Sequence, residues 1–345
     1  MSIIQDFNLS NLDSLLRTFS ERPQALNLDT KLAQLMQALL ADHLDLLPLP
    51  GQGHTLQRWQ TLARVAGCDL ALAKLYEGHT DALAILAECG SAHLVGDAIW
   101  GVWAAEPPDA RARIVSREGD QVRLAGRKAW CSGALQIDRA LITAWADDDQ
   151  PQLVAIELAH TRQRLHIDNW QAVGMGTTTS VEIEFDDAPG VAVGQPGQYL
   201  SRPGFWHGGA GIAACWYGAA VALASPLQRS PRVDDNAQAA ALLGQVDMAL
   251  QASAALLREL AAWIDAMPSQ PHTSDVTRVR SVVERACVQV LDAVGRALGP
   301  APMCLDPGHA QRWADLTVFI RQSHADRDWA ELGRAIQRQE QPWTL

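Results

Sequence analysis

The sequence has little cationic charge, few phenylalanines and tyrosines, and no closely spaced cysteines. Lys and Arg total 28 against 39 Asp and Glu, which gives a formal net charge of −11. This balance argues against a nucleic-acid or anionic-membrane surface, because phosphate binding needs clustered cations. The six cysteines lie far apart, at positions 68, 89, 131, 215, 287 and 304. Their spacing indicates neither a disulfide framework nor a zinc site, which fits a reducing compartment.

Signals for export, metal binding and membrane insertion are also missing. The first residues, MSIIQDFNLSNLDSLL, contain no basic stretch followed by an apolar one, so we expect no signal peptide and a cytoplasmic protein. The ten histidines show no HExxH or paired spacing, which argues against a catalytic metal. Residues 203–228 are uncharged, but they are rich in Gly and Ala. We therefore predict a closely packed buried helix there rather than a membrane span.

Hydrophobic periodicity divides the chain into three regions. Apolar residues recur at helical spacing over 24–95, with a break expected near Gly67 or Gly78. Short alternating segments follow, and SVEIEF (180–185) reads as a half-buried strand. Helical spacing then returns to the end. We predict an α+β protein with a helical N-terminal domain (1–95), a small antiparallel β-barrel (96–200) and a C-terminal four-helix bundle (201–345).

Four segments, in this order, carry a resemblance to a known family. They are LARVAGCDLALAKLYEGH (62–79), LAGRKAWCSGALQIDRALITA (124–144), WQAVGMGTTTSVEIEFDDAPG (170–190), and the Gly-rich turn GRALGPAP followed by Arg312 and Asp315. Together they resemble the acyl-CoA dehydrogenase superfamily. That resemblance implies the three-domain order above, an FAD cofactor and a homodimer or homotetramer. It also implies an acyl thioester or related small substrate, and an electron-transfer flavoprotein as possible acceptor.

The middle segment carries the cofactor prediction. On an extended strand Trp130 and Ser132 would point to the same side, while Cys131 would point to the other and act as inert packing. The resemblance implies that Trp130 lies against the flavin ring and that the Ser132 hydroxyl donates a hydrogen bond near its reactive nitrogen. The alternative from the residues alone is a barrel-core Trp130 and a turn-capping Ser132.

A second flavin-contacting strand of the family matches VWAAEPPDARA (102–112) incompletely. Trp103, Glu106 and Pro107 fit, whereas Ala105 replaces a hydroxyl and the family's Gly-Ser-Asp loop is missing. We interpret Trp103 and Ala105 as the cofactor-binding positions that the resemblance implies. A further family motif, Arg-x-x-Phe-Gly, reaches the FAD pyrophosphate of a neighbouring subunit. Here SPLQRSPRVDDN (225–236) has Arg229 and Arg232 but no Phe-Gly.

The family's catalytic glutamate, which removes a substrate proton, is replaced at both of its usual places. One place falls at Ser323 and His324, and the other falls at His207 to Gly209. Ser323 and His324 are the predicted catalytic residues, with His324 as candidate base because an imidazole titrates near neutral pH. A packed or capping histidine is the alternative at both places.

Three functions follow from these observations. The first is an FAD-dependent oxidoreductase acting on an acyl-CoA or related substrate, with electrons passed on to an acceptor. The second is a flavin-dependent monooxygenase on the same scaffold, in which reduced flavin meets O₂ and no carboxylate base is required. The third is a catalytically degenerate binding or scaffold member.

Overall fold

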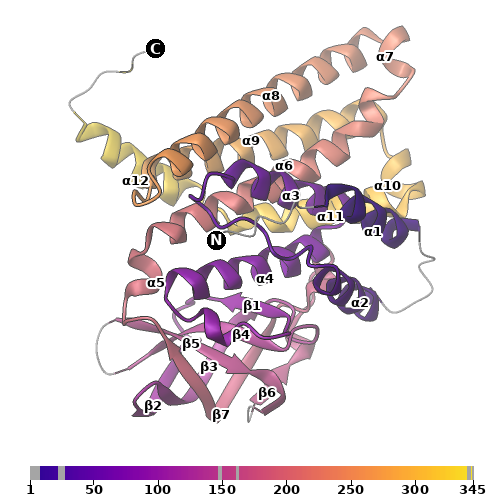
Figure 1. Ribbon diagram of the computed structural model, residues 1–345. Coiled ribbons are helices and arrows are strands. Elements are labelled where there is room, and N and C mark those ends of the chain that lie inside the picture. The colour runs from indigo at the N-terminus through magenta and orange to yellow at the C-terminus, as the bar shows by residue number, and fades with distance from the viewer. Residues whose placement is uncertain (1–7, 22–27, 147–149, 161–162, 340–342, 344–345) are drawn as a thin grey trace. The chain divides into compact units, whose positions relative to one another are not determined.

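A computed structural model describes residues 8–21, 28–146, 150–160, 163–339 and 343 (Figure 1). Its contacts divide the described chain into two compact units. The first unit contains the described residues of Met1–Leu49 and Ala71–Phe205, and the second contains those of Pro50–Leu70 and Trp206–Leu345. The α-helices and strands are α1 Leu9–Glu21, α2 Leu28–Ala41, α3 Thr55–Cys68, α4 Leu70–Glu88, β1 Trp100–Trp103, β2 Ala112–Glu118, β3 Gln121–Cys131, β4 Arg139–Trp145, β5 Pro151–Glu157, β6 Gln163–His166, β7 Val181–Val193, α5 Gln198–Ser201, α6 Pro203–Gln228, α7 Arg232–Asp235, α8 Ala237–Ala266, α9 Thr273–Leu298, α10 Ala301–Leu305, α11 Pro307–Phe319 and α12 Asp326–Gln337.

The first unit is built on one sheet of seven strands. The strand order is β1-β4-β2-β3-β7-β5, with β6 paired to β7 and an additional pairing between β4 and β5. The prediction of a purely antiparallel sheet is wrong, because β4 runs parallel to both β1 and β2. The β2–β3 hairpin lies between β1 and β4 in the chain, so β4 is not joined to β1 by a tight turn and can enter in the same direction.

Helix α4 covers one face of this sheet with apolar side chains (Figure 1). The cluster joins Ala82, Ile85 and Leu86 of α4 to side chains of four strands and α5: Trp100, Leu141, Leu153, Ala155, Val193 and Tyr199. A second contact is polar: the His79 Nδ1 accepts the Trp100 backbone N–H at 3.0 Å, and its Nε2 lies 3.1 Å from Asp45 Oδ2. Because Nδ1 accepts, the proton sits on Nε2 and points to the carboxylate. This histidine therefore connects α4 to the start of β1.

The helical pattern of the N-terminal third is confirmed in the described residues, and the structure locates the break within it. Helix α3 ends at Cys68 and α4 begins at Leu70, with Asp69 in an extended conformation between them. The predicted break near Gly67 is therefore correct. Gly78, the other expected position, lies inside α4.

The second unit is helical, as predicted, but its fourth long segment is not one helix. The run from Ala310 to Gln339 reads as continuous in sequence, yet α11 ends at Phe319 and α12 begins at Asp326. The interruption contains Ala325 at φ 45°, a conformation that non-glycine residues rarely adopt. Helix α3 also packs on α8 in this unit, so the helical core includes a segment from the N-terminal third.

Two described helices are long and apolar enough to cross a membrane by length and composition, which is weak evidence by itself. They are Pro203–Gln228 (α6) and Ala237–Ala266 (α8). In α6, 67% of the apolar window is buried, in line with the predicted packed helix. In α8 the buried share is only 28%.

Gly218 gives a sharp test of the close packing between α6 and α3. A Cβ added at this glycine would lie 2.0 Å from the backbone oxygen of Ala63. Alanine normally favours a helix by up to about 1 kcal/mol over glycine. Here we expect Gly218→Ala to lower the free energy of unfolding by about 2–4 kcal/mol instead, because the backbone of α3 must move. Urea denaturation followed by circular dichroism measures the change. Gly333→Ala, on open helix surface, is the matched control and should cost nothing.

Candidate functional site

Trp130 is an exposed aromatic side chain at an irregular end of β3. The β3–β7 pairing shifts register between Lys128 and Cys131, and Trp130 takes φ 60° there. Its side chain is 59% exposed and meets the Trp170 ring edge to face, with centroids 6.3 Å apart. The Trp170 indole N–H donates to the Gly176 carbonyl at 2.8 Å, which fixes that ring. The alternative of a barrel-core Trp130 is therefore wrong.

The bulge also changes the predicted relation between Trp130 and Ser132. Strand alternation requires regular extended backbone, and this stretch contains a left-handed residue followed by a turn, with Ser132 just beyond the strand end. The alternation of a regular strand therefore does not determine which way the Trp130 and Ser132 side chains point. Cys131 is fully buried, as predicted, and burial raises the pKa of its thiol well above the usual range.

A row of three hydroxyls runs from Ser132 into the protein. Ser132 Oγ lies 2.8 Å from Ser180 Oγ, which lies 2.9 Å from Thr178 Oγ1. Thr178 Oγ1 lies 2.7 Å from the Met175 carbonyl, which can only accept a hydrogen bond. Each hydroxyl has one proton, so the donors run Ser132 to Ser180 to Thr178 to Met175. In this arrangement Ser132 presents lone pairs outward and acts as an acceptor, whereas the sequence predicts a donor.

The two other predicted cofactor positions lie at the end of β1. Trp103 is almost fully buried, and its indole N–H donates to the Ser132 carbonyl at 2.9 Å. Because a buried ring offers no face to a ligand, the geometry does not support the predicted direct contact between Trp103 and the flavin. Trp103 instead positions the Ser132 turn. Ala105 is exposed in the loop that follows β1.

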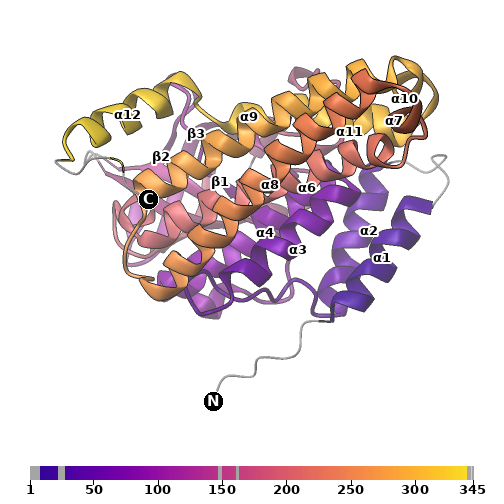
Figure 2. The same cartoon turned by 90° about the horizontal axis from the view of Figure 1, so that it is seen from above.

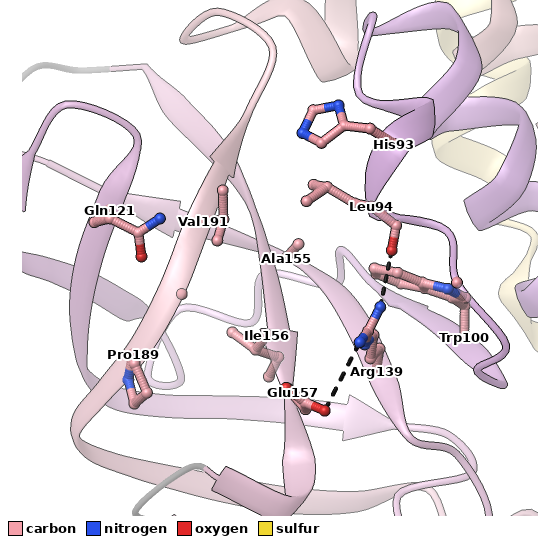
Figure 3. A pocket seen from close by; sticks show the side chains of 12 residues that line it. His93, Leu94, Trp100, Gln121, Arg139, Ala155, Ile156, Glu157, Pro189 and Val191 are labelled. Carbon is pink, nitrogen blue, oxygen red and sulfur yellow. Dashed lines mark hydrogen bonds and ion pairs between the residues drawn. The ribbon is translucent and has the colours of Figure 1, made fainter.

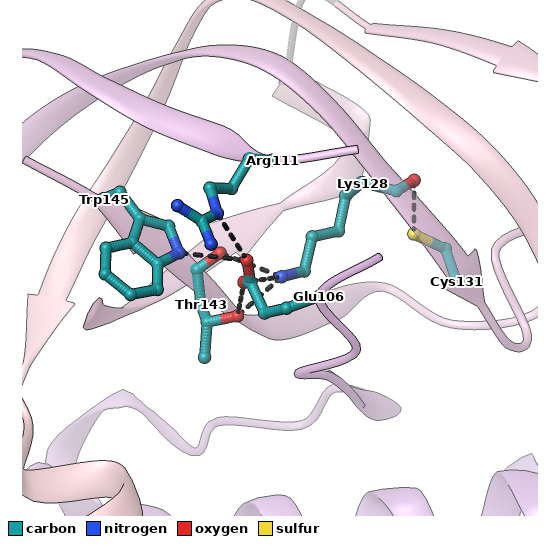
Figure 4. Close-up of polar contacts among 6 residues, drawn as sticks. All are labelled: Glu106, Arg111, Lys128, Cys131, Thr143 and Trp145. Atoms are coloured by element: carbon teal, nitrogen blue, oxygen red, sulfur yellow. Dashed lines mark hydrogen bonds and ion pairs between the residues drawn. The ribbon is translucent and has the colours of Figure 1, made fainter. Parts of the chain in front are cut away.

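A charge pair between a fully buried lysine and a partly buried glutamate, which sequence reasoning missed, fixes this loop (Figure 4). Lys128 is fully buried, and its ammonium donates to the Glu106 carboxylate and, at 3.1 Å, to the Thr143 carbonyl. Glu106 also accepts from the Thr143 hydroxyl and, at 2.9 Å, from the Trp145 indole. Burial lowers the pKa of Lys128, and the hydrogen bond that its ammonium donates to Glu106 opposes that shift. Glu106 lies in the quoted segment 102–112 and Lys128 in the quoted segment 124–144, so their places in these two motifs were the sequence signal for the pair.

The predicted catalytic residues lie in the second unit, between α11 and α12. His324 is exposed, and its Nδ1 lies 3.4 Å from Asp328 Oδ1. Ser323 is buried, and its hydroxyl donates to Glu284 Oε2 at 2.8 Å. Glu284 belongs to α9, and Arg321 lies 3.8 Å from its other oxygen. Glu284 thus places a carboxylate beside Ser323, although the sequence has no glutamate near that position. This carboxylate already accepts a hydrogen bond from the Ser323 hydroxyl and lies near the Arg321 guanidinium.

The other weighed residues make internal contacts. His207 is buried, with Nε2 2.8 Å from the Gln270 carbonyl, and its ring lies beside that of His272. Arg232 donates to the Leu298 carbonyl at 3.1 Å. Among the described residues, no group of three or more His, Cys, Asp or Glu side chains could hold a metal ion.

A pocket of about 550 Å³ lies at the opposite end of β1 (Figure 3). Trp100 and Arg139, which pair at the starts of β1 and β4, line it together with Glu157 and His93. Arg139 donates to the Leu94 carbonyl at 2.9 Å, lies 3.8 Å from Glu157 and covers the Trp100 ring. The guanidinium is therefore engaged by the protein itself. None of the predicted site residues lines this pocket.

No protein-family model matches the chain, and no curated protein sequence gives a significant match. Solved structures match it over nearly its whole length. The dibenzothiophene monooxygenase TdsC from Paenibacillus sp. A11-2, solved with FMN and indole, is 18% identical with a TM-score of 0.76 over 96% of this chain and 98% of that one. The methanesulfinate monooxygenase MsuC from Pseudomonas fluorescens is 17% identical, with a TM-score of 0.68 over 98% of both chains.

A third similar structure is KijD3, solved with FMN and a dTDP-linked amino sugar. It is 18% identical, with a TM-score of 0.74 over 95% of this chain and 92% of that one. These matched proteins are flavoproteins of the acyl-CoA dehydrogenase superfamily. The chain therefore shares the fold of these proteins, with helices before and after a seven-stranded sheet in the sequence.

Proposed function

We propose that the protein is a flavin-dependent monooxygenase that uses reduced FMN. The observation that carries this proposal is the direction of the hydroxyl row at Ser132. The central ring nitrogen of an oxidised isoalloxazine accepts a hydrogen bond, whereas the reduced ring carries an N–H there and donates. An outward-facing acceptor at Ser132 suits the reduced ring. The similar structures support the same choice: TdsC and MsuC are monooxygenases, and TdsC and KijD3 were solved with FMN.

The residues present fit a flavin. Trp130 offers an exposed indole face, and Trp170 holds that indole from its edge. Ser132 offers a polar contact one residue beyond Cys131, and Trp103 holds its backbone. The Glu106–Lys128 pair fixes the loop after β1. When bound and reduced, a flavin supplies the electrons with which O₂ is activated. These side chains would orient the flavin ring, and the Ser132 hydroxyl would accept a hydrogen bond from an N–H at the ring edge.

The choice of FMN over FAD rests on the C-terminal sequence and on the comparisons. The family turn that reaches an FAD pyrophosphate has no Phe-Gly here, and Arg232 is bound to the end of α9. FMN lacks the adenylate half and needs no such contact. FMN is also the flavin in two of the similar structures. This proposal replaces the FAD-dependent acyl-CoA oxidation that the resemblance implies.

The reaction is tested with the protein loaded with FMN. Photoreduced protein is mixed with isotopically labelled O₂ and a panel of small aromatic heterocycles and sulfur compounds, and products are examined by mass spectrometry. Incorporation of one labelled oxygen atom is the expected result. In parallel, oxidised protein is mixed anaerobically with acyl-CoAs of several lengths. Loss of the visible flavin absorbance in that arm would identify a dehydrogenase and contradict the proposal.

Ser180→Ala tests the direction of the hydroxyl row. Without the Ser180 oxygen, the Ser132 proton has no internal acceptor and can turn outward to an oxidised ring. We expect the affinity for oxidised FMN to rise about two- to tenfold relative to that for reduced FMN, the range of one net hydrogen bond. Anaerobic titrations of both redox states measure the ratio. Ser116→Ala, an exposed serine of β2, is the control. An unchanged ratio would contradict the assigned direction.

A further inference from the structure

The pocket at the start of β1 lies where two strands of the sheet separate. Strand β5 pairs with β7 through Leu153–Ala155. Beyond that point Ile156 and Glu157 stay paired with β4, while Pro189 and Gly190 stay paired with β3. A hollow of about 550 Å³ opens there, beside the turn that leads from α4 into β1, two elements that are neighbours in both views (Figure 1, Figure 2). Its volume suits a small-molecule ligand.

This pocket is distant from the proposed flavin site. Gln121 lines the pocket at the first residue of β3, and Trp130 lies near the other end of the same strand. Nine steps along an extended strand span up to about 30 Å. A ligand in this pocket would therefore occupy a second site of the first unit, separate from the flavin.

The charged groups of the pocket balance one another. Arg139 and Glu157 are the two charged side chains among the described residues that line it, with His93 counted as neutral. Arg139 Nη2 lies 3.8 Å from Glu157 Oε1, which is longer than a hydrogen bond, and the two side chains are 32% and 48% exposed. A loose, partly exposed ion pair contributes little to stability. A ligand that contacts each charge separately therefore replaces a weak interaction.

The Arg139 guanidinium is held in place without using all of its donors. Its Nη1 donates to the Leu94 carbonyl at 2.9 Å, and the group covers the Trp100 ring. A Cβ added at Gly96 would lie 3.2 Å from Nη1, so the chain also closes in on the guanidinium at this glycine. A guanidinium has further N–H donors beyond the one that Leu94 accepts. These donors suit a carboxylate, which binds a guanidinium through two parallel hydrogen bonds.

Apolar side chains surround the rest of the hollow. Leu94, Pro189 and Val191 line it and are half-buried, so each has apolar surface that a ligand can cover (Figure 3). Figure 3 also shows Arg139 and Glu157 next to one another beside this apolar lining. A pocket of this kind fits a ligand with an apolar body and two adjacent polar groups.

We propose that this pocket binds a small apolar amino acid. Its carboxylate would lie on Arg139, its ammonium on Glu157, and its side chain on the apolar lining. The two charges of an α-amino acid are attached to one carbon, which matches two opposite charges that lie side by side. Glu157 would repel a ligand with a carboxylate alone, and Arg139 would repel a ligand with an ammonium alone. The zwitterion is therefore the ligand that the balanced charges select.

The test is isothermal titration calorimetry at neutral pH with three probes that share one carbon skeleton. L-Leucine has both charges, 4-methylpentanoate has the carboxylate alone, and 3-methylbutylamine has the ammonium alone. We expect L-leucine to bind with a dissociation constant of about 0.1–1 mM. The other two should bind about tenfold more weakly or worse, because each loses a charged hydrogen bond. Glycine, which lacks the apolar side chain, should also bind at least about tenfold more weakly.

Two variants assign the contacts. Glu157→Gln should weaken L-leucine binding about tenfold and leave 4-methylpentanoate binding no weaker than in the wild type. Arg139→Gln should weaken both of these probes and spare 3-methylbutylamine. Glu184→Gln, at a similarly exposed glutamate of β7, is the control and should change nothing. Circular dichroism and urea denaturation establish that each variant is folded, and Glu157→Gln alone suffices if Arg139→Gln is not.

Three results would overturn the proposal. They are no binding of L-leucine in the millimolar range, equal affinities for L-leucine and 4-methylpentanoate, and an L-leucine affinity that Glu157→Gln leaves unchanged. The titrations are made without FMN and repeated with Trp130→Ala, which should bind L-leucine as the wild type does. Failure of the amino-acid site and failure of the proposed flavin site are therefore distinguishable.

Discussion

Replacing Trp130 by Ala is expected to weaken FMN binding about tenfold to a hundredfold. The exposed indole is the flat surface on which we place the ring, and stacking of a heterocycle on an aromatic side chain contributes about 1–3 kcal/mol. Because the side chain is mostly exposed, its removal should change the free energy of unfolding by less than about 0.5 kcal/mol. Quenching of FMN fluorescence during titration gives the affinity, and urea denaturation gives the stability.

Two variants make the Trp130 result specific. Trp130→Phe keeps an aromatic face and should retain most of the affinity. Trp329→Ala removes another half-exposed indole, on α12 of the second unit, and should leave the affinity unchanged. Equal FMN affinity in the wild type and Trp130→Ala would show that the ring does not lie on this indole.

Glu106→Gln is expected to destabilise the protein by about 3–5 kcal/mol. The substitution keeps the shape of the side chain but leaves the fully buried Lys128 ammonium without its counter-charge, and breaking a buried ion pair from one side costs this much. The Trp145 indole also loses a charged acceptor. Glu118→Gln, at an exposed position on the same sheet, should change stability very little. Urea denaturation at neutral pH measures both.

The decrease in the free energy of unfolding caused by Glu106→Gln should become smaller as pH rises. Burial lowers the pKa of Lys128 from 10.5 in the folded state, and removing Glu106 removes the opposing effect, so the folded pKa falls further. Between the folded and unfolded pKa values the unfolded chain binds more protons, and the free energy of unfolding therefore increases with pH. The variant should regain stability relative to the wild type as pH rises toward 10.5. Adding Lys128→Met should remove this pH dependence. A loss that stays constant with pH would contradict the explanation.

The sequence predicts element types well because hydrophobic spacing is local. Helical spacing before residue 96 and after residue 200, with short alternating segments between, corresponds to the observed helices and sheet. Conformation that depends on a distant partner was not predictable. The bulge at Trp130 arises in the pairing of β3 with β7, and the interruption before Asp326 has no glycine or proline to mark it.

The candidate site was predictable in part for the same reason. Motif positions predict Trp130 and Ser132 as cofactor contacts without any structure. The Ser132 hydroxyl changed from predicted donor to acceptor because of Ser180, which lies 48 positions away in the sequence. Glu284 reaches Ser323 from 39 positions away, so counting along the chain near Ser323 finds no carboxylate. Side-chain identity can be read from the sequence, but hydrogen-bond direction requires the partners that the fold supplies.

The central claim is that the site holds FMN and favours its reduced form, and the reduction potential of bound FMN tests this most directly. A flavin bound more tightly when reduced has a higher potential than the free flavin, by linkage between binding and reduction. The potential is measured by anaerobic spectroelectrochemistry of the FMN-loaded protein and compared with that of free FMN. The account predicts a positive shift that Ser180→Ala diminishes. A negative shift, or a protein that takes up no FMN, would contradict it.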